Sequence, residues 1–507
     1  MLTTVGAFTI NRNTKNSLPE SLSDGTLTNT WTFSGYGELD RKSYSIGGNS
    51  IYSYVLTRDL AGRIIQKDET INGTASIYAY VYDVNGRLTQ VKQNNTPSEI
   101  YTYDSNGNRL TEINTLRNVN RSYTFSSEDQ VLSAGNETYQ FDVDGFLTRK
   151  TSGTNISTYQ YSSRGELLSA ILPGGIVITY DHDPLGRRIT KRINGTITEK
   201  YLWKDSVTLL AVYDGSNNLV MRFTYADGRM PVSMSYGSIT YYLAYDQVGS
   251  LRMVTDTSGV ITKRVDYDSF GSIISDTNPA MTIPFGFAGG LHDKDTGLVR
   301  FGARDYDPPL SRWTAKDPID FNGGDTNLYG YVANDPINFR DSMGLWGEDV
   351  HSGIGNSSYG TYTWAQQLGL SSQQAMWIAE GNNGTDGGLA GFLPIFGEQS
   401  RHFNQLNPWM NGYSDSRDYW AFLELMRAVK YYKQRNCRVA YGYLGRGLHS
   451  IQDKFAHRDW ETGWHGLYEH PPWYDSWNDP KNQLARELTE IATKDYISQF
   501  LLLIGQQ

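Results

Sequence analysis

The sequence predicts a chain of two unlike parts, a β-rich repeat region over residues 1–345 and an all-helical region over residues 346–507. Two observations predict this division. A short motif with a glycine turn recurs through the first part, mostly every 20 to 25 residues, and such a period is typical of repeat proteins. After residue 345 the motif stops, and apolar residues fall at helical spacing instead.

The repeat motif reads aromatic, any residue, aromatic and aspartate, followed by a short turn with glycine and then a strand. Its copies are "YVYDVNGRLTQV", "YTYDSNGNRLTEI", "YQFDVDGFLTRK", "YQYSSRGELLSA" and "YDHDPLGRRITKR". Alternating Tyr, Val and Thr around Asn-Gly or Asp-Gly turns predicts β-hairpins. Because one hairpin cannot bury its own apolar face, the hairpins must stack into a long sheet.

These copies resemble the tyrosine-aspartate repeats of the Rhs family over most of residues 30–345. They end in a segment similar to the core of that family, "GFAGGLHDKDTGLVRFGARDYDPPLSRWTAKDPIDF" and "NLYGYVANDPINFRDSMGL", at about residues 285–345. The resemblance implies a hollow β-shell around a variable C-terminal domain, which is usually a toxin. A region of this length is short for a closed shell, so we expect a partial shell or one that a partner chain completes. A repeat adhesin without cargo is the alternative.

Composition limits the classes of function. The formal net charge of −9 argues against a broad nucleic-acid-binding surface, and the single cysteine, Cys437, excludes an intrachain disulfide framework and a cysteine zinc finger. The first residues lack the pattern of a signal peptide, and no apolar run approaches the roughly 18 residues of a membrane helix. We therefore expect a soluble chain that a specialised system secretes or delivers into target cells.

The resemblance also implies self-cleavage. Rhs proteins cut themselves after the leucine of a D-P-x-G-L motif, and a second, upstream copy supplies another aspartate. The downstream copy here is "DSMGL", with Ser342 in place of proline. The upstream copy is "DPIDF", with Asp320 and Phe321 in place of glycine and leucine. The cut implied lies between Leu345 and Trp346.

The two aspartates implied are Asp317 and Asp341. Two carboxyl groups held close together share one proton, because both cannot ionise cheaply. One can then activate water while the other protonates the leaving amide. The alternative is that both aspartates only cap turns, which is a common use of this residue.

The region after residue 345 predicts helices. The segments "RDYWAFLELMRAVKYYKQ" and "NQLARELTEIATKDYISQFLLLI" have apolar residues at helical spacing. The segment "SSQQAMWIAEG" begins with serines suited to a helix N-cap and ends at a glycine suited to a C-cap. Six of the eight histidines and nine of the twelve tryptophans lie here, so the chemistry of this region differs from that of the repeats.

One motif in this region favours a metal site. The segment "YLGRGLHSIQDKFAHRDW" spaces His449, Asp453 and His457 four residues apart, so on a helix they share one face. Imidazole and carboxylate groups are zinc ligands. The segment "WHGLYEH" adds His465 and Glu469 with the same spacing. The alternative is that the histidines are structural polar groups.

The region resembles the superfamily of zinc-dependent phospholipases C and single-strand nucleases. Members are helical, bind three zinc ions and begin with a tryptophan whose free amino group and carbonyl bind zinc. The start "WGEDVH" is similar to the nucleases, whereas "YLGRGLHSIQDKFAH" and "WHGLYE" are more similar to the phospholipases. The resemblance implies about three zinc ions. The ligands implied are Trp346, His351, Asp386, His402, His449, Asp453, His457, His465 and Glu469, with Glu380 as the substitute for Asp386.

The chemistry of such a site is phosphodiester hydrolysis, because clustered zinc ions lower the pKa of a bound water and neutralise phosphate oxygens. Asp386 is the candidate base. Residues 346–507 hold 13 Lys and Arg against 17 Asp and Glu, which favours a phospholipid over a polynucleotide substrate. A nuclease and an unrelated helical metal-binding domain are the alternatives. We therefore expect a self-cleaving toxin, used against competing or host cells, whose partners are a cognate immunity protein and a secretion-system component.

Overall fold

The structure, a computed structural model, describes residues 3–13, 18–34, 38–59, 62–226, 228–320, 325–345, 361–368, 370–371, 374–375, 377–379, 416–435, 437–456 and 483–505. Within the helices, the side chains of residues 362–363, 367, 416–420, 438, 449–456 and 483–490 lie outside this description. The statements that follow concern the described residues.

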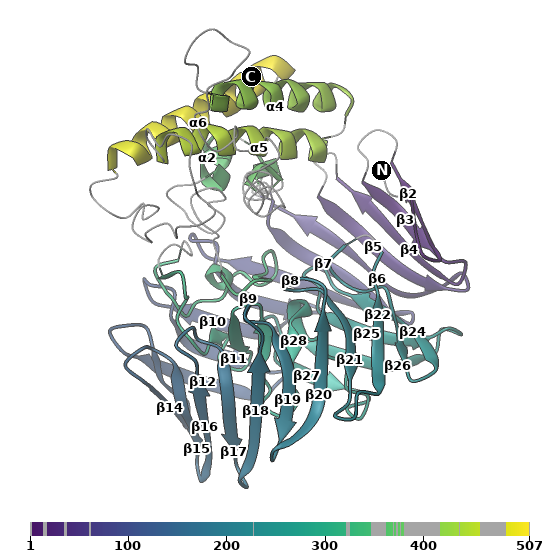
Figure 1. Cartoon of the computed structure of the whole chain (residues 1–507), viewed down its shortest axis with the longest axis vertical. Coiled ribbons are helices and arrows are strands. Elements are labelled where there is room, and N and C mark those ends of the chain that lie inside the picture. The colour runs from purple at the N-terminus through teal and green to yellow at the C-terminus, as the bar shows by residue number, and fades with distance from the viewer. Residues whose placement is uncertain are drawn as a thin grey trace.

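Residues 4–276 form one sheet in which each strand pairs antiparallel with the next along the chain (Figure 1). Its strands are β1 (Thr4–Val5), β2 (Phe8–Arg12), β3 (Pro19–Ser23), β4 (Leu27–Phe33), β5 (Leu39–Ile46), β6 (Asn49–Arg58), β7 (Ile64–Ile71), β8 (Thr74–Tyr82), β9 (Leu88–Gln93), β10 (Thr96–Tyr103), β11 (Arg109–Asn114), β12 (Val119–Phe125), β13 (Val131–Ala134), β14 (Glu137–Phe141), β15 (Leu147–Ser152), β16 (Asn155–Tyr161), β17 (Leu167–Leu172), β18 (Ile176–His182), β19 (Arg188–Ile193), β20 (Thr196–Trp203), β21 (Leu209–Tyr213), β22 (Leu219–Thr224), β23 (Ser233–Tyr236), β24 (Ile239–Tyr245), β25 (Leu251–Asp256), β26 (Ile261–Tyr267) and β27 (Ile273–Asp276). The hairpins predicted from the repeats are therefore confirmed.

Most repeat turns are closed by their own aspartate, and Ser162 takes that place in "YQYSSRGELLSA". In one copy, Asp83 Oδ1 accepts the backbone N–H groups of Asn85 at 2.9 Å and Arg87 at 3.0 Å. Gly86 adopts a φ of 82°, a conformation that glycine reaches without steric cost. The Arg87 side chain returns to Asp83 Oδ2 at 2.7 Å and lies 5.1 Å from the ring centroid of Tyr103 on β10. The aspartate and glycine thus close one turn, and this turn packs against the second aromatic residue of the next copy.

The first aromatic residue of the motif faces the buried side of the sheet. The buried tyrosines at this position are Tyr80, Tyr101, Tyr123, Tyr139, Tyr159 and Tyr180. Each ring removes a large apolar area from water, so stacking of the hairpins is driven mainly by this face.

Residues 285–345 fold as a compact segment against that face. It holds a four-stranded sheet of β28 (Leu291–His292), β29 (Val299–Phe301), β30 (Arg304–Asp307) and β31 (Arg312–Trp313), with short 3-10 turns η1 (Phe287–Gly289) and η3 (Val332–Asn334). Its centre is a cluster of aromatic rings. Tyr306 lies 4.5 Å from Tyr331 and 5.7 Å from Trp313, measured between ring centroids. The segment is bonded to the repeats at Leu147, whose N–H donates to the Thr314 carbonyl at 2.9 Å.

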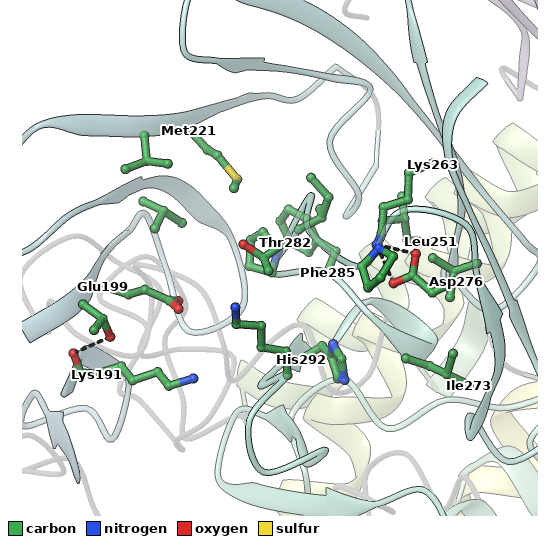
Figure 2. A pocket seen from close by; sticks show the side chains of 18 of the residues that line it. Lys191, Glu199, Met221, Leu251, Lys263, Ile273, Asp276, Thr282, Phe285 and His292 are labelled. Carbon is green, nitrogen blue, oxygen red and sulfur yellow. Dashed lines mark hydrogen bonds and ion pairs between the residues drawn. The ribbon is translucent and has the colours of Figure 1, made fainter. Parts of the chain in front are cut away.

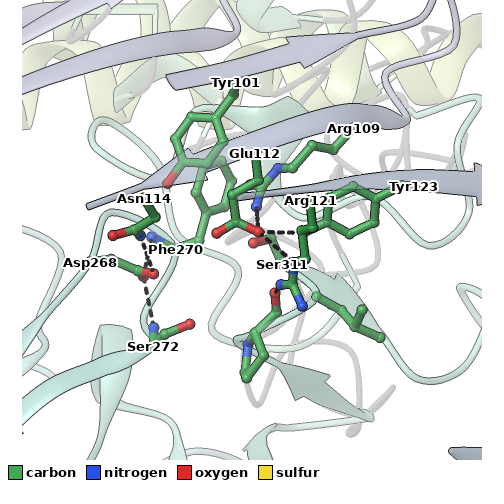
Figure 3. A network of polar contacts seen from close by, with 12 residues as sticks. Tyr101, Arg109, Glu112, Asn114, Arg121, Tyr123, Asp268, Phe270, Ser272 and Ser311 are labelled. Atoms are coloured by element: carbon green, nitrogen blue, oxygen red, sulfur yellow. Dashed lines mark hydrogen bonds and ion pairs between the residues drawn. The ribbon is translucent and has the colours of Figure 1, made fainter. Parts of the chain in front are cut away.

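A buried network of charges joins β11 and β12 to the turn after β26 in the same sheet (Figure 3). Glu112 on β11 accepts from Arg117 at 3.1 Å, Arg121 at 2.9 Å and Tyr123 at 2.5 Å. Arg117 also contacts Asp268 at 2.9 Å, in the turn after β26. Burial would raise the pKa of Glu112, but the neighbouring arginines outweigh burial and hold it below its usual value. Pairing offsets part of the desolvation cost of burying these charges.

Beyond residue 360 the described elements are helices: α2 (Thr361–Gln367), α4 (Ser416–Lys433), α5 (Cys437–Ala456) and α6 (Gln483–Ile504). They gather on one side of the sheet, with α4 on the far side of α5 from the strands in Figure 1. Their common core includes Leu425, Tyr441, Leu444 and Phe500. Helices α4 and α6 match two of the segments predicted from helical spacing. Among the described residues, no helix is long and apolar enough to cross a membrane.

Candidate self-cleavage site

The predicted aspartates lie together around one arginine. Arg304 is on β30, and Asp317 lies shortly after the end of β31. Asp341 lies in the stretch of chain that follows η3. All three side chains are almost completely buried, with 2% to 6% of each exposed. Residues 24 positions apart in the chain therefore meet in a region that excludes bulk water.

Arg304 is bonded through all three of its nitrogens. Its Nη2 lies 2.6 Å from Asp317 Oδ2 and 3.3 Å from Asp341 Oδ2. Its Nε donates to the Gly344 carbonyl at 2.6 Å, and its Nη1 donates to the Leu328 carbonyl at 3.2 Å. The indole of Trp313 covers the guanidinium, with the ring centroid 4.3 Å from Cζ. This planar, fully bonded group fixes the positions of both carboxyl groups.

Asp341 also contacts the chain at the predicted cut. Its Oδ1 accepts the backbone N–H of Leu345 at 3.1 Å. The preceding Gly344 has a φ of 66°, and a Cβ placed there would collide with the backbone of Phe301 and Arg304. Only glycine therefore lets this stretch lie so close to β29 and β30. The residue before the predicted cut is held directly beside the aspartate pair.

Burial sets the protonation of the pair. It raises the pKa of Asp317 to about 6, and the like charge of Asp341 adds to this effect against the opposing effect of Arg304. Burial also raises the pKa of Asp341, while Arg304 and the backbone N–H groups of residues 343–345 oppose it. One guanidinium cannot neutralise two buried carboxylates, so the pair holds one shared proton until the pH rises through about 6.

One departure from the family pattern has a visible consequence. Asp320, which stands where the upstream motif has glycine, has a φ of 50°. Its N–H donates to the Asp317 carbonyl at 2.9 Å and closes the turn that holds the catalytic candidate. Aspartate tolerates this left-handed conformation better than most residues. The substitution therefore keeps the turn that glycine would form.

Self-cleavage should slow as pH rises through about 6. The pair needs one protonated and one ionised carboxyl group, and the raised pKa of Asp317 means that its proton is lost near that value. Uncut chain recovered from inclusion bodies would be refolded into buffers from about pH 5 to about pH 8, and the cut fraction followed on denaturing gels. A rate that does not fall across this range would contradict the shared-proton arrangement.

Most of the predicted metal ligands cannot be placed. Seven lie outside the described residues: Trp346, His351, Asp386, His402, His457, His465 and Glu469. The remaining two, His449 and Asp453, are both on α5, which is helical over Cys437–Ala456. Their positions are one helical turn apart, as predicted. In the part of the chain that the structure describes, no three or more metal-binding side chains come together.

A second polar region lies apart from the aspartate pair. It is a cavity of about 240 Å³ between β19–β22 and β25–β27 (Figure 2). Lys263 on its wall is bonded to both oxygens of Asp276, at 2.7 and 2.6 Å. Burial lowers the pKa of His292, so its imidazole is neutral. No residue predicted from the sequence lines this cavity, and we assign no role to it.

Sequence reasoning missed Arg304 and Trp313. Both lie in the quoted core segment, in "GARDYD" and "SRW", but neither belongs to a cutting motif. Arginine is common in this segment, and nothing in its local pattern distinguishes the one that contacts both aspartates. Only the fold identifies it.

Comparison with known proteins gives a consistent picture for the repeats. Human Teneurin-4 is 30% identical over 342 residues, which cover 64% of this chain and 12% of Teneurin-4. Teneurin-m of Drosophila melanogaster is 26% identical over 313 residues, which cover 60% of this chain and 11% of that protein. The chain thus spans only about an eighth of the length of the teneurins that it matches.

Solved structures that match part of this chain include components of Tc toxins. A Photorhabdus luminescens Tc holotoxin pore has 18% identity and a TM-score of 0.38, over 67% of this chain and 21% of that chain. The TcdB2–TccC3 complex without its hypervariable C-terminal region has 13% identity and a TM-score of 0.32, over 66% of this chain and 25% of that chain. The Teneurin YD-shell family model matches residues 1–337. The chain belongs to the Teneurin YD-shell family.

Proposed function

We propose that this YD-shell protein cuts itself between Leu345 and Trp346 and so separates residues 346–507 from the shell. The observation that carries the proposal is the contact of Arg304 with Asp317 and Asp341 beside the Gly344–Leu345 backbone. Turn capping alone does not require two buried carboxyl groups on one guanidinium. The pair instead has the arrangement that general acid–base chemistry needs.

The reaction is hydrolysis of one peptide bond. The ionised carboxylate takes a proton from water as the water oxygen attacks the Leu345 carbonyl carbon. The protonated carboxyl group gives its proton to the Trp346 nitrogen as the C–N bond breaks. The products are a carboxylic acid at Leu345 and an amine at Trp346, and one proton remains on the pair. Asp341, through its bond to the Leu345 N–H, also holds the peptide unit that precedes the bond that breaks.

A denaturing gel of the purified protein tests the proposal. Two pieces are expected, corresponding to residues 1–345 and 346–507, and sequencing of the smaller piece should begin at Trp346. A protein that remains one full-length band would contradict it. A cut at another bond would also do so, because the proposal places the cut between Leu345 and Trp346.

For the released piece we infer a zinc-dependent phosphodiester hydrolase. The observation that favours it is α5, whose single helix over Cys437–Ala456 carries His449 and Asp453 one turn apart. Imidazole and carboxylate at this spacing fit a shared metal ion. The residues that would hold the ions are Trp346, His351, Asp386 or Glu380, His402, His449, Asp453, His457, His465 and Glu469. When bound, zinc would supply a hydroxide at neutral pH and neutralise phosphate oxygens.

A phospholipid is the favoured substrate and a single-stranded nucleic acid the alternative. Assays of both substrates side by side with zinc would separate them, and hydrolysis of neither would remove the enzyme proposal. The proposed setting is delivery into competing or host cells by a secretion system, with an immunity protein protecting the producer. A further chain that completes the open shell is the proposed structural partner.

A further inference from the structure

The basic residues of the C-terminal region are concentrated on α4 and the start of α5. Between residues 421 and 446 the sequence has one acidic residue, Glu424, and six basic residues. The rest of residues 346–507 has seven basic and sixteen acidic residues. The basic residues are Arg427, Lys430, Lys433, Arg435, Arg438 and Arg446. A region that is acidic on the whole therefore contains one strongly basic stretch.

Four of these cations are exposed to solvent. Lys430, Lys433 and Arg435 are exposed, and 45% of the Arg427 side chain is exposed. The one acid, Glu424, is buried and is already paired with Arg427 at 2.6 Å. The surface thus keeps an excess of positive charge that no described side chain neutralises.

Large apolar side chains accompany these cations. Phe422 is 55% exposed and Met426 is 36% exposed, and they lie one helical turn apart on α4. Lys430 is one further turn along the same row. Nearby, the rings of Tyr431 and Tyr443 stack with their centroids 5.1 Å apart, and Arg446 lies 3.9 Å above Tyr443. Figure 1 places α4 on the side of the helices that faces away from the sheet.

We propose that this surface, the basic α4 face of Phe422, Met426, Arg427, Lys430 and Lys433, binds membranes that contain anionic phospholipids. Charge complementarity selects an anionic partner, because each Lys or Arg near an anionic membrane surface adds to the attraction. The exposed phenylalanine and methionine favour lipid, because they can enter the boundary between headgroups and acyl chains. A polynucleotide would match the charge but would not explain why the apolar side chain of Met426 is exposed.

The inference rests on the proposed function only for the choice of a phospholipid as the binding partner. The binding measurement needs neither hydrolysis nor self-cleavage, so its failure and the failure of the proposed function can be distinguished. The purified full chain would be sedimented with vesicles of phosphatidylcholine alone and of phosphatidylcholine with about 30% phosphatidylglycerol. Binding at least about tenfold tighter to the anionic vesicles is expected, and it should weaken as salt is raised.

Two variants separate charge from apolar contact. Lys430→Glu with Lys433→Glu should weaken binding to anionic vesicles about tenfold or more. Phe422→Ser with Met426→Ser should weaken binding several-fold without removing the salt dependence. Arg222→Glu, at an exposed position on β22 of the shell, changes charge elsewhere and should bind as the wild type does. Circular dichroism would show that each variant is folded.

Three outcomes would overturn the proposal. They are no binding to anionic vesicles, equal binding by the wild type and the lysine variant, and an equal loss in the Arg222→Glu control. Binding to single-stranded DNA that the lysine variant loses, without vesicle binding, would assign the face to nucleic acid instead. Vesicle binding without any phosphodiester hydrolysis would leave the basic α4 face established and would reject only the enzyme proposal.

Discussion

Replacing Asp341 with asparagine should leave a single full-length band where the wild type gives two. Asparagine keeps the shape of the side chain and can still accept the Leu345 N–H, but it cannot take or give the proton. Loss of a general acid or base typically slows a reaction roughly a hundredfold to ten-thousandfold. Asp317→Asn should have the same effect, because one carboxyl group acts as the base and the other as the acid. Denaturing gels over several days measure both.

Arg304 provides a graded version of the same test. Arg304→Lys keeps a positive charge but cannot bond Asp317, Asp341 and the Gly344 carbonyl together. We expect slow but detectable cleavage in this variant. Arg304→Met should cut more slowly still, because two buried carboxyl groups then lose their counter-charge and both hold protons.

The control is Asp320→Asn. This carboxyl group is exposed, three residues from Asp317, and makes no contact with Arg304. Asparagine tolerates its left-handed φ equally well. The variant should cut at a rate close to that of the wild type. If Asp341→Asn also cuts normally, the pair is structural and the turn-capping interpretation is correct.

The hairpins could be predicted because each turn is formed by residues that lie close together in the sequence. Asp83, Gly86 and Arg87 are within five positions of each other, and together they close one turn. The same holds for α4 and α6, whose apolar spacing is a property of a single segment. Sequence patterns report such structures directly because no distant residue is needed to form them.

The site could be predicted only in part, because its geometry is not local. The family resemblance supplied Asp317 and Asp341, but Arg304 lies 37 positions from Asp341 and reaches it only once β30 has formed. Closure of the sheet is a similar case. Strand pairing follows from the repeats, whereas its closure depends on how far the sheet curves. The ligand set around His449 is the extreme case, since it joins segments more than 100 residues apart in the sequence.

Zinc content should depend on self-cleavage, because one of the proposed ligands does not exist before the cut. In the uncut chain the Trp346 nitrogen is an amide, whose lone pair is delocalised into the carbonyl group. After the cut it is an amine that can bind a metal once deprotonated. Cut protein should therefore contain about three zinc ions per chain and the uncut Asp341→Asn protein fewer, as measured by elemental analysis after dialysis.

Substitutions on α5 distinguish a metal site from a structural role for its polar residues. His449→Ala and Asp453→Ala should each lower zinc content and abolish phosphodiester hydrolysis, whereas circular dichroism should change little because alanine favours helix. Gln452→Ala lies about 100° around the helix from Asp453 and should keep both zinc and activity. Equal zinc in cut and uncut protein would reject the coupling. Zinc in neither would mean that the histidines are structural, and the hydrolase proposal would fail with the site, while the cut at Leu345 would still rest on Arg304 and its two aspartates.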